Sequence, residues 1–281
     1  MDKTSLGNRM KQYEKEFRAY IPEKSYTILR LDGKAFHTYT RGLERPFDYG
    51  LIEDMSETAK YLCENIQGAW LGYTQSDEIT IVLTPFAKET SDTWFNGNIQ
   101  KMTSVSASMA TANFNQLRMS RACNNSDDDY EQDLLTRYDI NWFKLAMFDS
   151  RVFTLPSKEE VMNCLIWRQR DAIRNSVSMA AQSVYSHKEL HKKSSTDMLE
   201  MLKMKGIDWN EYPESAKKGT IIRKYLKTIK NENGESLRSK WVKEGAFDFK
   251  VDENIDKIIP SPGYGYNDGH LKLIPKLDET I

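Results

Sequence analysis

The order of its apolar runs constrains the fold of this chain more than any other feature of the sequence. Runs rich in β-branched and aromatic residues alternate with stretches in which apolar residues recur every three or four positions. After a first helical stretch over 5–19, the pattern predicts strand, helix, strand, strand, helix and strand over 26–31, 48–66, 69–73, 79–83, 98–117 and 143–155. The last of these is a single strand or a hairpin.

This β-α-β-β-α-β order is typical of the ferredoxin-like arrangement, in which the third strand lies antiparallel between the first two. We therefore predict an α+β fold, with helices packed on an antiparallel sheet. Asp32 ends the first strand, whereas Asp77 and Glu78 begin the third, 45 residues further on. We expect these carboxylates to meet at one edge of the sheet.

The remainder of the chain is predicted to be mostly helical and locally basic. Helical periodicity extends over 159–181 and is less regular over 189–203. The whole chain has a net charge of -1, yet residues 217–243 hold nine basic against two acidic residues. We divide the chain into a sheet domain over 1–155, a helical, basic portion over 156–250 and a loose C-terminal tail over 251–281.

Composition argues against several classes of protein. The chain has no run of about 18 apolar residues, and its first twenty residues are rich in charge. Its three cysteines are far apart and form no C-x-x-C pair. We expect neither a membrane span nor a secretory signal, neither a disulfide framework nor a thiolate zinc site, and a reducing cytoplasm as the location.

Asp32, Asp77 and Glu78 form the sharpest candidate for chemistry. Mg²⁺ prefers oxygen ligands and is commonly held by one or two carboxylates together with substrate phosphates. Paired metal ions serve phosphoryl and nucleotidyl transfer, and Gly33 allows a main-chain carbonyl to approach a cation closely. The alternative is that Asp32-Gly33 is an ordinary turn and that Asp77-Glu78 caps a hairpin.

Two weaker candidates leave their alternatives open. His37 is either a nucleotide contact or a packed structural residue, and the pattern alone favours structure. Arg168 and Arg170 lie one and three residues after Trp167. Two arginines beside an aromatic ring suit phosphate contact and stacking. A solvated helix face with one buried Trp explains the same residues equally well.

Several short motifs together resemble the tRNA-His guanylyltransferase family, in particular its Thg1-like branch of 3′-to-5′ polymerases. The resemblance covers residues 5 to 225, and its order and spacing are more specific than any single motif. The matching segments are Arg30-Leu-Asp-Gly-Lys-Ala-Phe-His37, Gly72-Tyr-Thr-Gln-Ser-Asp-Glu78, Phe148-Asp-Ser-Arg151, Leu155-Pro156, Trp167-Arg-Gln169 and Lys218-Gly-Thr220.

The resemblance implies a polymerase-like palm with two Mg²⁺ ions, held by Asp32, Asp77 and the carbonyl of Gly33. Ser76 and Glu78 match positions that support the family's activity. ATP and GTP or other nucleoside triphosphates are the implied substrates, with tRNA as the macromolecular partner and a homo-tetramer as the assembly. The implied nucleotide-binding residues are Lys34, Phe36, His37 and Lys101, the last because the family's triphosphate lysine falls at Gln100 or Lys101. As tRNA contacts we predict the basic side chains Arg168, Arg170, Arg174, Lys218, Lys224 and Lys227.

One departure from the family pattern bears on function. After Trp-Arg-Gln, guanylyltransferases proper carry His-Ile-Asn-x-Leu-Tyr-Asn, whereas this chain has Ala172-Ile-Arg-Asn-Ser-Val-Ser178. We therefore expect template-dependent 3′-to-5′ addition to 5′-truncated tRNA. The alternatives are obligate G addition to histidine tRNA, a nucleotidyl cyclase, and a non-catalytic RNA-binding module. The chain lacks the Gly-Gly-Asp/Glu-Glu-Phe hairpin of diguanylate cyclases and has no RNP-type aromatics on its first strand.

Overall fold

A single antiparallel sheet organises the chain. The computed structural model describes residues 4–86, 92–124, 144–231, 234–252, 255–261 and 274–276. Six strands in this part of the chain pair in the order β4-β1-β3-β2-β5-β6, all antiparallel. The strands are β1 Tyr26–Gly33, β2 Ala69–Gln75, β3 Glu78–Leu83, β4 Phe148–Leu155, β5 Thr220–Asn231 and β6 Gly234–Gly245.

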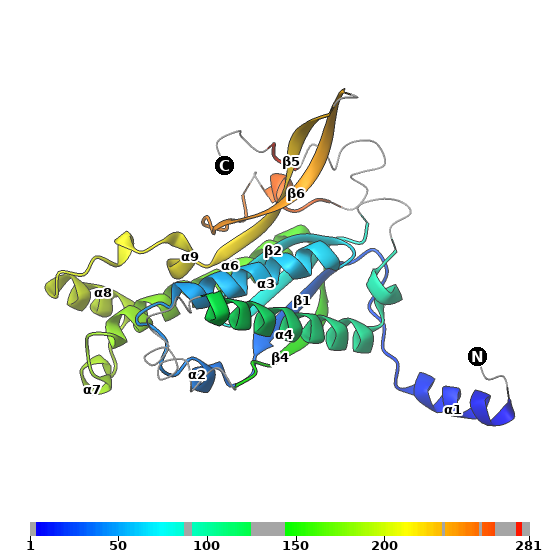
Figure 1. Cartoon of the computed structure of the whole chain (residues 1–281), viewed down its shortest axis with the longest axis horizontal. Helices are drawn as coiled ribbons and strands as arrows, with labels where there is room; N and C mark the ends of the chain where they lie inside the picture. The colour runs from blue at the N-terminus through cyan, green and yellow to red at the C-terminus, as the bar shows by residue number, and fades with distance from the viewer. Residues whose placement is uncertain are drawn as a thin grey trace.

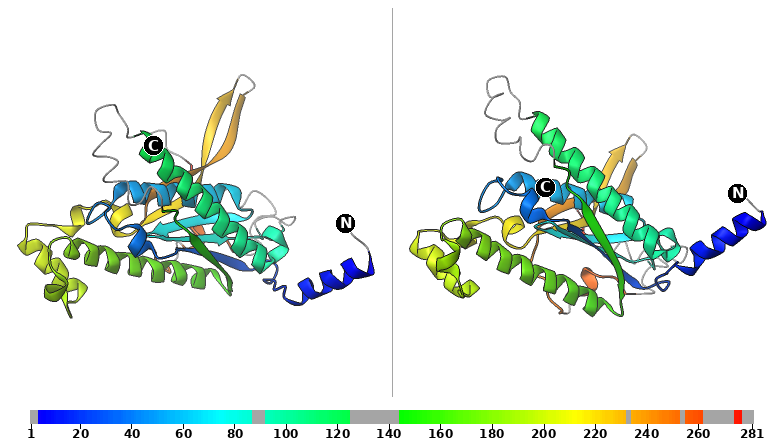
Figure 2. Two further views of the ribbon diagram at one scale, coloured as in Figure 1. Left: turned by 60° about the horizontal axis from the view of Figure 1, so that its bottom comes forward. Right: turned by 90° about the horizontal axis from the view of Figure 1, so that it is seen from below.

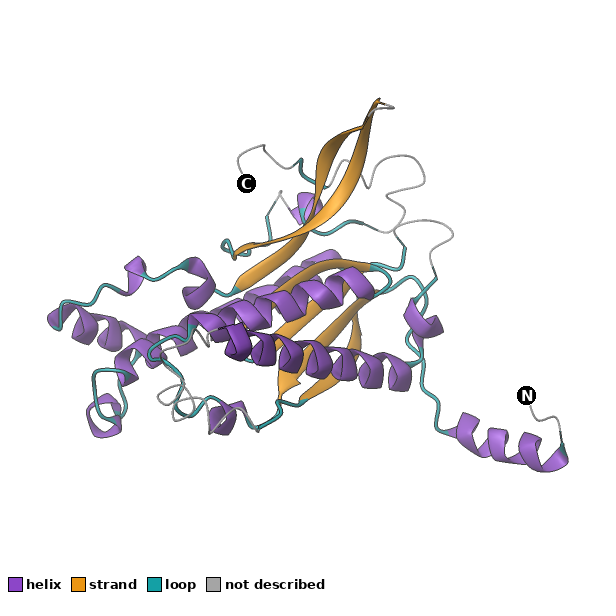
Figure 3. Cartoon of the chain, in the orientation of Figure 1, coloured by secondary structure: helices purple, strands orange, loops and turns teal. Residues whose placement is uncertain are grey.

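Helices cover both faces of the sheet (Figures 1 and 3). The α-helices are α1 Ser5–Glu16, α2 Phe36–Tyr39, α3 Tyr49–Asn65, α4 Ile99–Asn124, α6 Lys158–Gln182, α7 His187–Leu190, α8 Ser195–Met204 and α9 Glu214–Lys217. Short 3-10 turns lie at η1 Trp94–Gly97, η2 Trp209–Glu211 and η3 Ile255–Lys257.

The predicted strand order is confirmed at the centre of the sheet. β3 lies between β1 and β2 and pairs antiparallel with both. Side chains alternate between the two faces of each strand. Leu29 and Leu31 of β1 therefore join one core, and Ile28 joins the other.

α3 and α4 cover the first face (Figure 2). Asp48 caps α3 as predicted, since its side chain accepts a hydrogen bond from the Leu51 N–H at 2.7 Å. Between the two helices, Asp54 is buried and pairs with Arg118 and Arg121 at 3.1 and 2.7 Å. This ion pair fixes the helix layer without reaching the other side of the sheet.

α6 and a C-terminal segment cover the second face (Figure 2). Within the tail that we expected to be loose, Ile255 and Ile259 are buried, and the Tyr26 hydroxyl donates to the Pro260 carbonyl at 2.7 Å. The described part of the tail therefore packs against the sheet, and its remaining residues lie outside the described ranges.

The region after α9 departs from the prediction. Thr220–Gly245, expected within a helical portion, forms the β5–β6 hairpin, whose first four residues extend the sheet along β2. The hairpin then projects from the body of the molecule (Figure 1). The division predicted at residue 155 therefore falls within one shared sheet and core, and its functional meaning stays a prediction.

The N-terminal helix α1 extends away from the sheet (Figure 1) and contains no buried residue. Its predicted apolar face faces solvent instead of a core: Leu6, Met10 and Tyr13, together with Phe17 just beyond its end, are all exposed. Among the described residues, no helix combines the length and apolar composition needed to cross a bilayer.

Candidate active site

The predicted carboxylates meet at one edge of the sheet. Asp32, at the end of β1, pairs in register with Glu78 of β3. The Gly33 N–H donates to the Asp77 carbonyl at 3.0 Å, which joins the β2–β3 turn to the end of β1. We call Asp32, Asp77 and Glu78 the acid edge.

Gly33 is required at the end of β1 because of its neighbours. A Cβ at this position would lie 2.3 Å from a ring carbon of Phe36. That ring is itself fixed, since Phe36 is only 5% exposed and stacks among Tyr39, Phe114 and Phe148. The acid edge therefore rests directly on the aromatic core.

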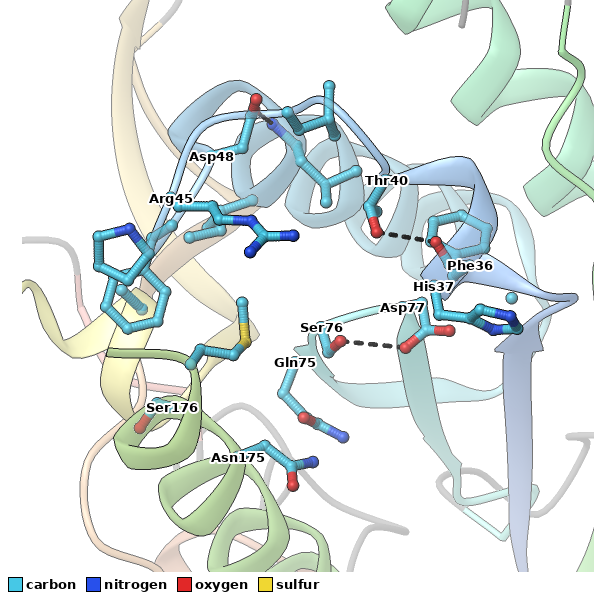
Figure 4. Close-up of a pocket in the computed structure, with 18 of the residues that line it drawn as sticks. Phe36, His37, Thr40, Arg45, Asp48, Gln75, Ser76, Asp77, Asn175 and Ser176 are labelled. Atoms are coloured by element: carbon cyan, nitrogen blue, oxygen red, sulfur yellow. Dashed lines mark hydrogen bonds between the residues drawn. The ribbon is translucent and has the colours of Figure 1, made fainter. Parts of the chain in front are cut away.

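The β2–β3 turn holds Asp77 in a defined position. Ser76 has a left-handed backbone, with φ of 50°, and its hydroxyl donates to the Asp77 carboxylate at 3.0 Å (Figure 4). A non-glycine residue in this conformation stores strain and often marks a functional turn. Burial raises the pKa of Asp77, the Ser76 hydrogen bond opposes this rise, and the charge of Asp32 adds to it.

A second group of ionisable residues lies around Asp32 on the edge strand. Asp149 of β4 pairs in register with Asp32. Arg151 lies 3.7 Å from the Asp32 carboxylate and 3.4 Å from that of Asp149. All three side chains are partly exposed, so the acid edge opens toward solvent on this side.

Glu78 has a different environment from its two acidic neighbours. Its side chain is 8% exposed, and the Arg168 Nε donates to its carboxylate at 2.6 Å. Burial raises the pKa of Glu78, and the charge and hydrogen bond of Arg168 oppose that rise. Glu78 therefore contacts a buried protein cation, whereas Asp77 lines a cavity and Asp32 lies between that cavity and the partly exposed Arg151.

That cavity has a volume of about 590 Å³ and lies between the acid edge, the α2–α3 connection, α6 and α9. Asp32, Gly33 and Asp77 line one end of it. The amides of Gln75 and Asn175 point into the space from two different elements, and Arg45 enters from the opposite wall (Figure 4). A cavity of this size is in the usual range for ligand sites.

The donor atoms at the acid edge fit a hard divalent cation. Asp32 and Asp77 offer carboxylate oxygens, and Gly33, on the same cavity wall, offers a main-chain carbonyl. Within the described ranges, no cluster of three or more His, Cys, Asp or Glu side chains suits a metal ion. Any ion would thus need water and substrate phosphates as further ligands, as Mg²⁺ usually does.

The structure gathers only some of the other predicted site residues. Phe36 and His37 line the cavity, with Phe36 chiefly a core residue and His37 exposed. Lys34 is exposed next to Gly33. Lys101 lies in the first turn of α4, where its ammonium is 6.0 Å from the ring centre of Phe95, and it does not line the cavity.

The predicted tRNA contacts fall into two groups. Arg170, Arg174 and Lys227 are exposed, although Arg174 also pairs with Asp171. The other three are engaged within the protein: Arg168 is buried against Glu78, Lys218 bridges Glu214 and Asp248, and Lys224 packs over the Trp241 ring at 4.7 Å. The burial of Arg168 does not fit our prediction that it contacts RNA.

Sequence reasoning missed most of the cavity wall. Arg45, Gln75 and Asn175 belong to three separate elements, and no periodicity or motif spacing indicated that they would converge. Gln75 carried one usable signal, because it directly precedes Ser76 within the matched motif. Packing between α6 and the α2–α3 connection brings the rest together.

Comparison with known proteins agrees with the fold and the motifs. The Thg1 family model, described as tRNAHis guanylyltransferase, matches residues 7–156. A bacterial tRNA(His) guanylyltransferase (Thg1)-like protein in complex with ATP superposes with a TM-score of 0.71 at 41% identity, covering 86% of this chain and 92% of the other. The corresponding complex with GTP gives a TM-score of 0.69 at 40% identity, covering 87% and 93%.

A curated relative supports the same assignment at lower similarity. The tRNA(His) guanylyltransferase of Debaryomyces hansenii is 27% identical over 231 residues, which cover 77% of this chain and 79% of the relative. The predicted family resemblance is thus confirmed over more than half of the sequence. This chain is a nucleotidyltransferase and belongs to the Thg1, or tRNAHis guanylyltransferase, family.

Proposed function

We propose that this chain adds nucleotides in the 3′-to-5′ direction to the 5′ end of 5′-truncated tRNA, using the opposing strand as template. The observation that carries the proposal is the position of Asp32 and Asp77 at one end of a cavity of about 590 Å³. The 5′ end would be activated as a triphosphate or by adenylylation. The 3′-hydroxyl of an incoming nucleotide would then attack the 5′ phosphorus, which forms a phosphodiester bond and releases pyrophosphate from a triphosphate end or AMP from an adenylylated end.

Within this proposal, Asp32, Asp77 and the Gly33 carbonyl hold two Mg²⁺ ions. Bound there, the ions would draw charge from phosphate oxygens and favour ionisation of the attacking hydroxyl. Ser76 keeps the Asp77 carboxylate oriented through its hydrogen bond. Glu78 supports these acids from its buried position.

ATP and GTP are the proposed substrates of the cavity. The two bacterial Thg1-like structures, in complex with ATP and with GTP, support this choice. The wall offers groups suited to a nucleotide: a guanidinium from Arg45 for phosphate, and the amides of Gln75 and Asn175, which can both donate and accept hydrogen bonds.

Template dependence is supported by where the family departure falls. Ala172, Asn175 and Ser176 of the divergent segment line the cavity. A change from the His-Ile-Asn-x-Leu-Tyr-Asn pattern therefore alters the wall of the proposed nucleotide site rather than a remote surface. Obligate addition of G to histidine tRNA is the alternative.

The proposed tRNA surface is one face of the β5–β6 hairpin. Alternation along the strands places Lys227, Arg238 and Lys240 on the same face, with Lys227 and Arg238 directly opposite each other. All three are exposed. We call them the basic hairpin face. Clustered cations of this kind bind nucleic-acid backbones by releasing counterions.

A homo-tetramer and a cytoplasmic location stay predictions. The exposed apolar face of α1 supports self-association, because an isolated helix of 12 residues is marginally stable in water without packing. Light scattering of the purified protein measures the assembly directly.

Incubation with Mg²⁺, labelled nucleoside triphosphates and tRNAs lacking different 5′ nucleotides tests the function at single-nucleotide resolution. Changing the opposing acceptor-stem base should change the nucleotide added, and addition should stop when the stem is complete. Addition of G whatever the opposing base would make the chain an obligate guanylyltransferase. RNA binding without incorporation would make it a binding module.

A further inference from the structure

Arg168 forms the most enclosed polar contact near the acid edge. It comes from α6, and its Nε donates to Glu78 at 2.6 Å, while one terminal nitrogen donates to Asp171 at 3.0 Å. The Arg168 side chain is 10% exposed and that of Glu78 is 8% exposed. A guanidinium this buried cannot serve as a surface ligand for RNA phosphates.

The guanidinium is held in a fixed orientation. The ring of Trp167 lies 4.4 Å from it, so one contact is to an aromatic ring and two are to carboxylates. The planar fork of arginine suits such a site, because it directs hydrogen bonds to two carboxylates at once. A lysine ammonium lacks that fixed geometry.

Glu78 connects this contact to the proposed metal-binding acids. It follows Asp77 directly in the chain and lies opposite Asp32 in the strand register, and side chains at opposed positions share one face of a sheet. Three carboxylates therefore crowd one strand end. Only one of them, Glu78, is buried against a protein cation.

The same helix also forms the cavity wall. Arg168 is anchored about two turns before Asn175 and Ser176, which line the cavity. Asp171, which accepts from Arg168, lies between them in the sequence and pairs with Arg174 as well. The Arg168–Glu78 contact thus sets the position of this wall relative to the acid edge.

We propose that Arg168 is a positioning residue: it neutralises and orients Glu78, so that the two cavity-lining carboxylates, Asp32 and Asp77, can bind divalent cations at the correct distance from the α6 wall. This inference rests on the proposed function. It assigns Arg168 to the metal site rather than to RNA binding, and it predicts an effect on metal affinity and kcat rather than on KM for tRNA.

A double-variant cycle tests this role. Mn²⁺ is titrated into the protein without RNA, and kcat and KM for tRNA are measured separately. We expect Arg168→Gln to weaken Mn²⁺ binding and lower kcat by about tenfold or more, as is typical for residues behind metal ligands. Arg168 acts through Glu78, so the two losses should not add. The double variant Arg168→Gln with Glu78→Gln should bind Mn²⁺ and turn over as well as the less active of the two single variants. Arg168→Lys, which keeps the charge, should recover part of the loss.

Arg118→Gln is the matched control, since it breaks a buried arginine–carboxylate pair with Asp54 in the α3–α4 layer. It should lower thermal stability without changing Mn²⁺ affinity or kcat. If Arg168→Gln fails to fold, Arg168→Lys and Glu78→Gln decide the question by the same two readouts.

Two results would overturn the inference: an unchanged Mn²⁺ affinity and kcat with a raised KM for tRNA, or additive losses in the double variant. A wild type that extends tRNA but binds no Mn²⁺ also contradicts it. The proposed function can fail separately. If the wild type extends no tRNA but Arg168→Gln still weakens Mn²⁺ binding, the proposed function is wrong and the role of Arg168 at the metal site is supported.

Discussion

The acid edge and the basic hairpin face belong to one sheet but differ in how extensively their strands are paired to the rest of it. β1 is paired on both sides, and the main chain of Gly33 is joined to that of Asp77 at 3.0 Å. β5 pairs with β2 only over Thr220–Arg223, after which the hairpin projects with Lys227 exposed. Rigidly held groups suit chemistry, and exposed charges suit affinity. Substitutions in the two regions should therefore change different kinetic constants.

The largest effect is expected from Asp77→Asn, with Asp32→Asn close to it. Either change removes a charged oxygen where charge develops on the transferring phosphate, so kcat should fall by about 100-fold or more. KM for tRNA should stay near its wild-type value, and the melting temperature should not fall. Steady-state incorporation of labelled nucleotide at saturating tRNA measures kcat. Wild-type turnover by either folded variant would remove the acid edge from the mechanism.

Gly33→Ala should damage the same region through packing. The new Cβ would lie 2.3 Å from Phe36, and overpacking of this kind costs about 1–3 kcal/mol. Because relief requires the end of β1 or the aromatic cluster to shift, we expect kcat to fall by roughly tenfold. Gly206→Ala is the control, since its site has open space and only a positive φ. Thermal melts and kcat for both variants separate strain at the acid edge from backbone strain alone.

The sheet's centre was predictable from sequence, whereas its extension was not. Tyr26–Leu31 and Ile79–Leu83 are nearly continuous apolar runs, as expected of strands buried on both faces, and such runs between turn residues identify β1 and β3. The basic residues of 217–243 suggested a solvated helix. In the structure, Thr220, Ile221 and Ile222 begin β5, and Gly234 begins β6. The many charged residues led us to overlook these β-branched residues, which favour a strand.

The candidate site divides in the same way. The meeting of Asp32, Asp77 and Glu78 at one sheet edge was predictable, because the strand order that brings them together follows from local patterns. Their role as metal ligands stays a prediction. The burial of Arg168 was not predictable, because an arginine beside a tryptophan has the same sequence whether α6 faces solvent or the sheet. Which of the two holds depends on how α6 packs on the sheet, and this packing brings Arg168 against Glu78, 90 residues earlier in the chain.

A smaller and different effect is expected on the basic hairpin face. The double variant Lys227→Gln with Arg238→Gln should raise KM for tRNA by on the order of tenfold at low salt and leave kcat unchanged. Each phosphate contact contributes about 0.7 to 0.9 to the salt slope, so the slope should fall by about 1.4 to 1.8. Binding of tRNA at several salt concentrations measures this. An unchanged slope would show that the hairpin face is merely solvated.

The smallest effect is expected from Lys243→Gln, on the other face of the same hairpin. Lys243 pairs with Glu57 at 2.6 Å and also with Glu53, both on α3, so it contributes to folding rather than to RNA binding. We expect a loss of about 0.5–1 kcal/mol in stability and no change in the salt slope for tRNA.

The stability that Lys243 contributes should depend on pH. Burial disfavours the charged form of Glu57, but Lys243 and, to a smaller extent, Lys60 outweigh it and hold the pKa of Glu57 below its usual 4.5. Burial likewise opposes the charge of Lys243, and the hydrogen bonds that Lys243 donates to Glu53 and Glu57 nevertheless raise its pKa above 10.5. The wild type should thus melt higher than Lys243→Gln between about pH 5 and 10. The difference should vanish as pH falls through the lowered glutamate pKa or rises through the raised lysine pKa.

If Lys243→Gln instead weakens tRNA binding as much as the Lys227 and Arg238 double variant, both faces of the hairpin contact RNA, and the contrast between a binding face and a packing face is wrong.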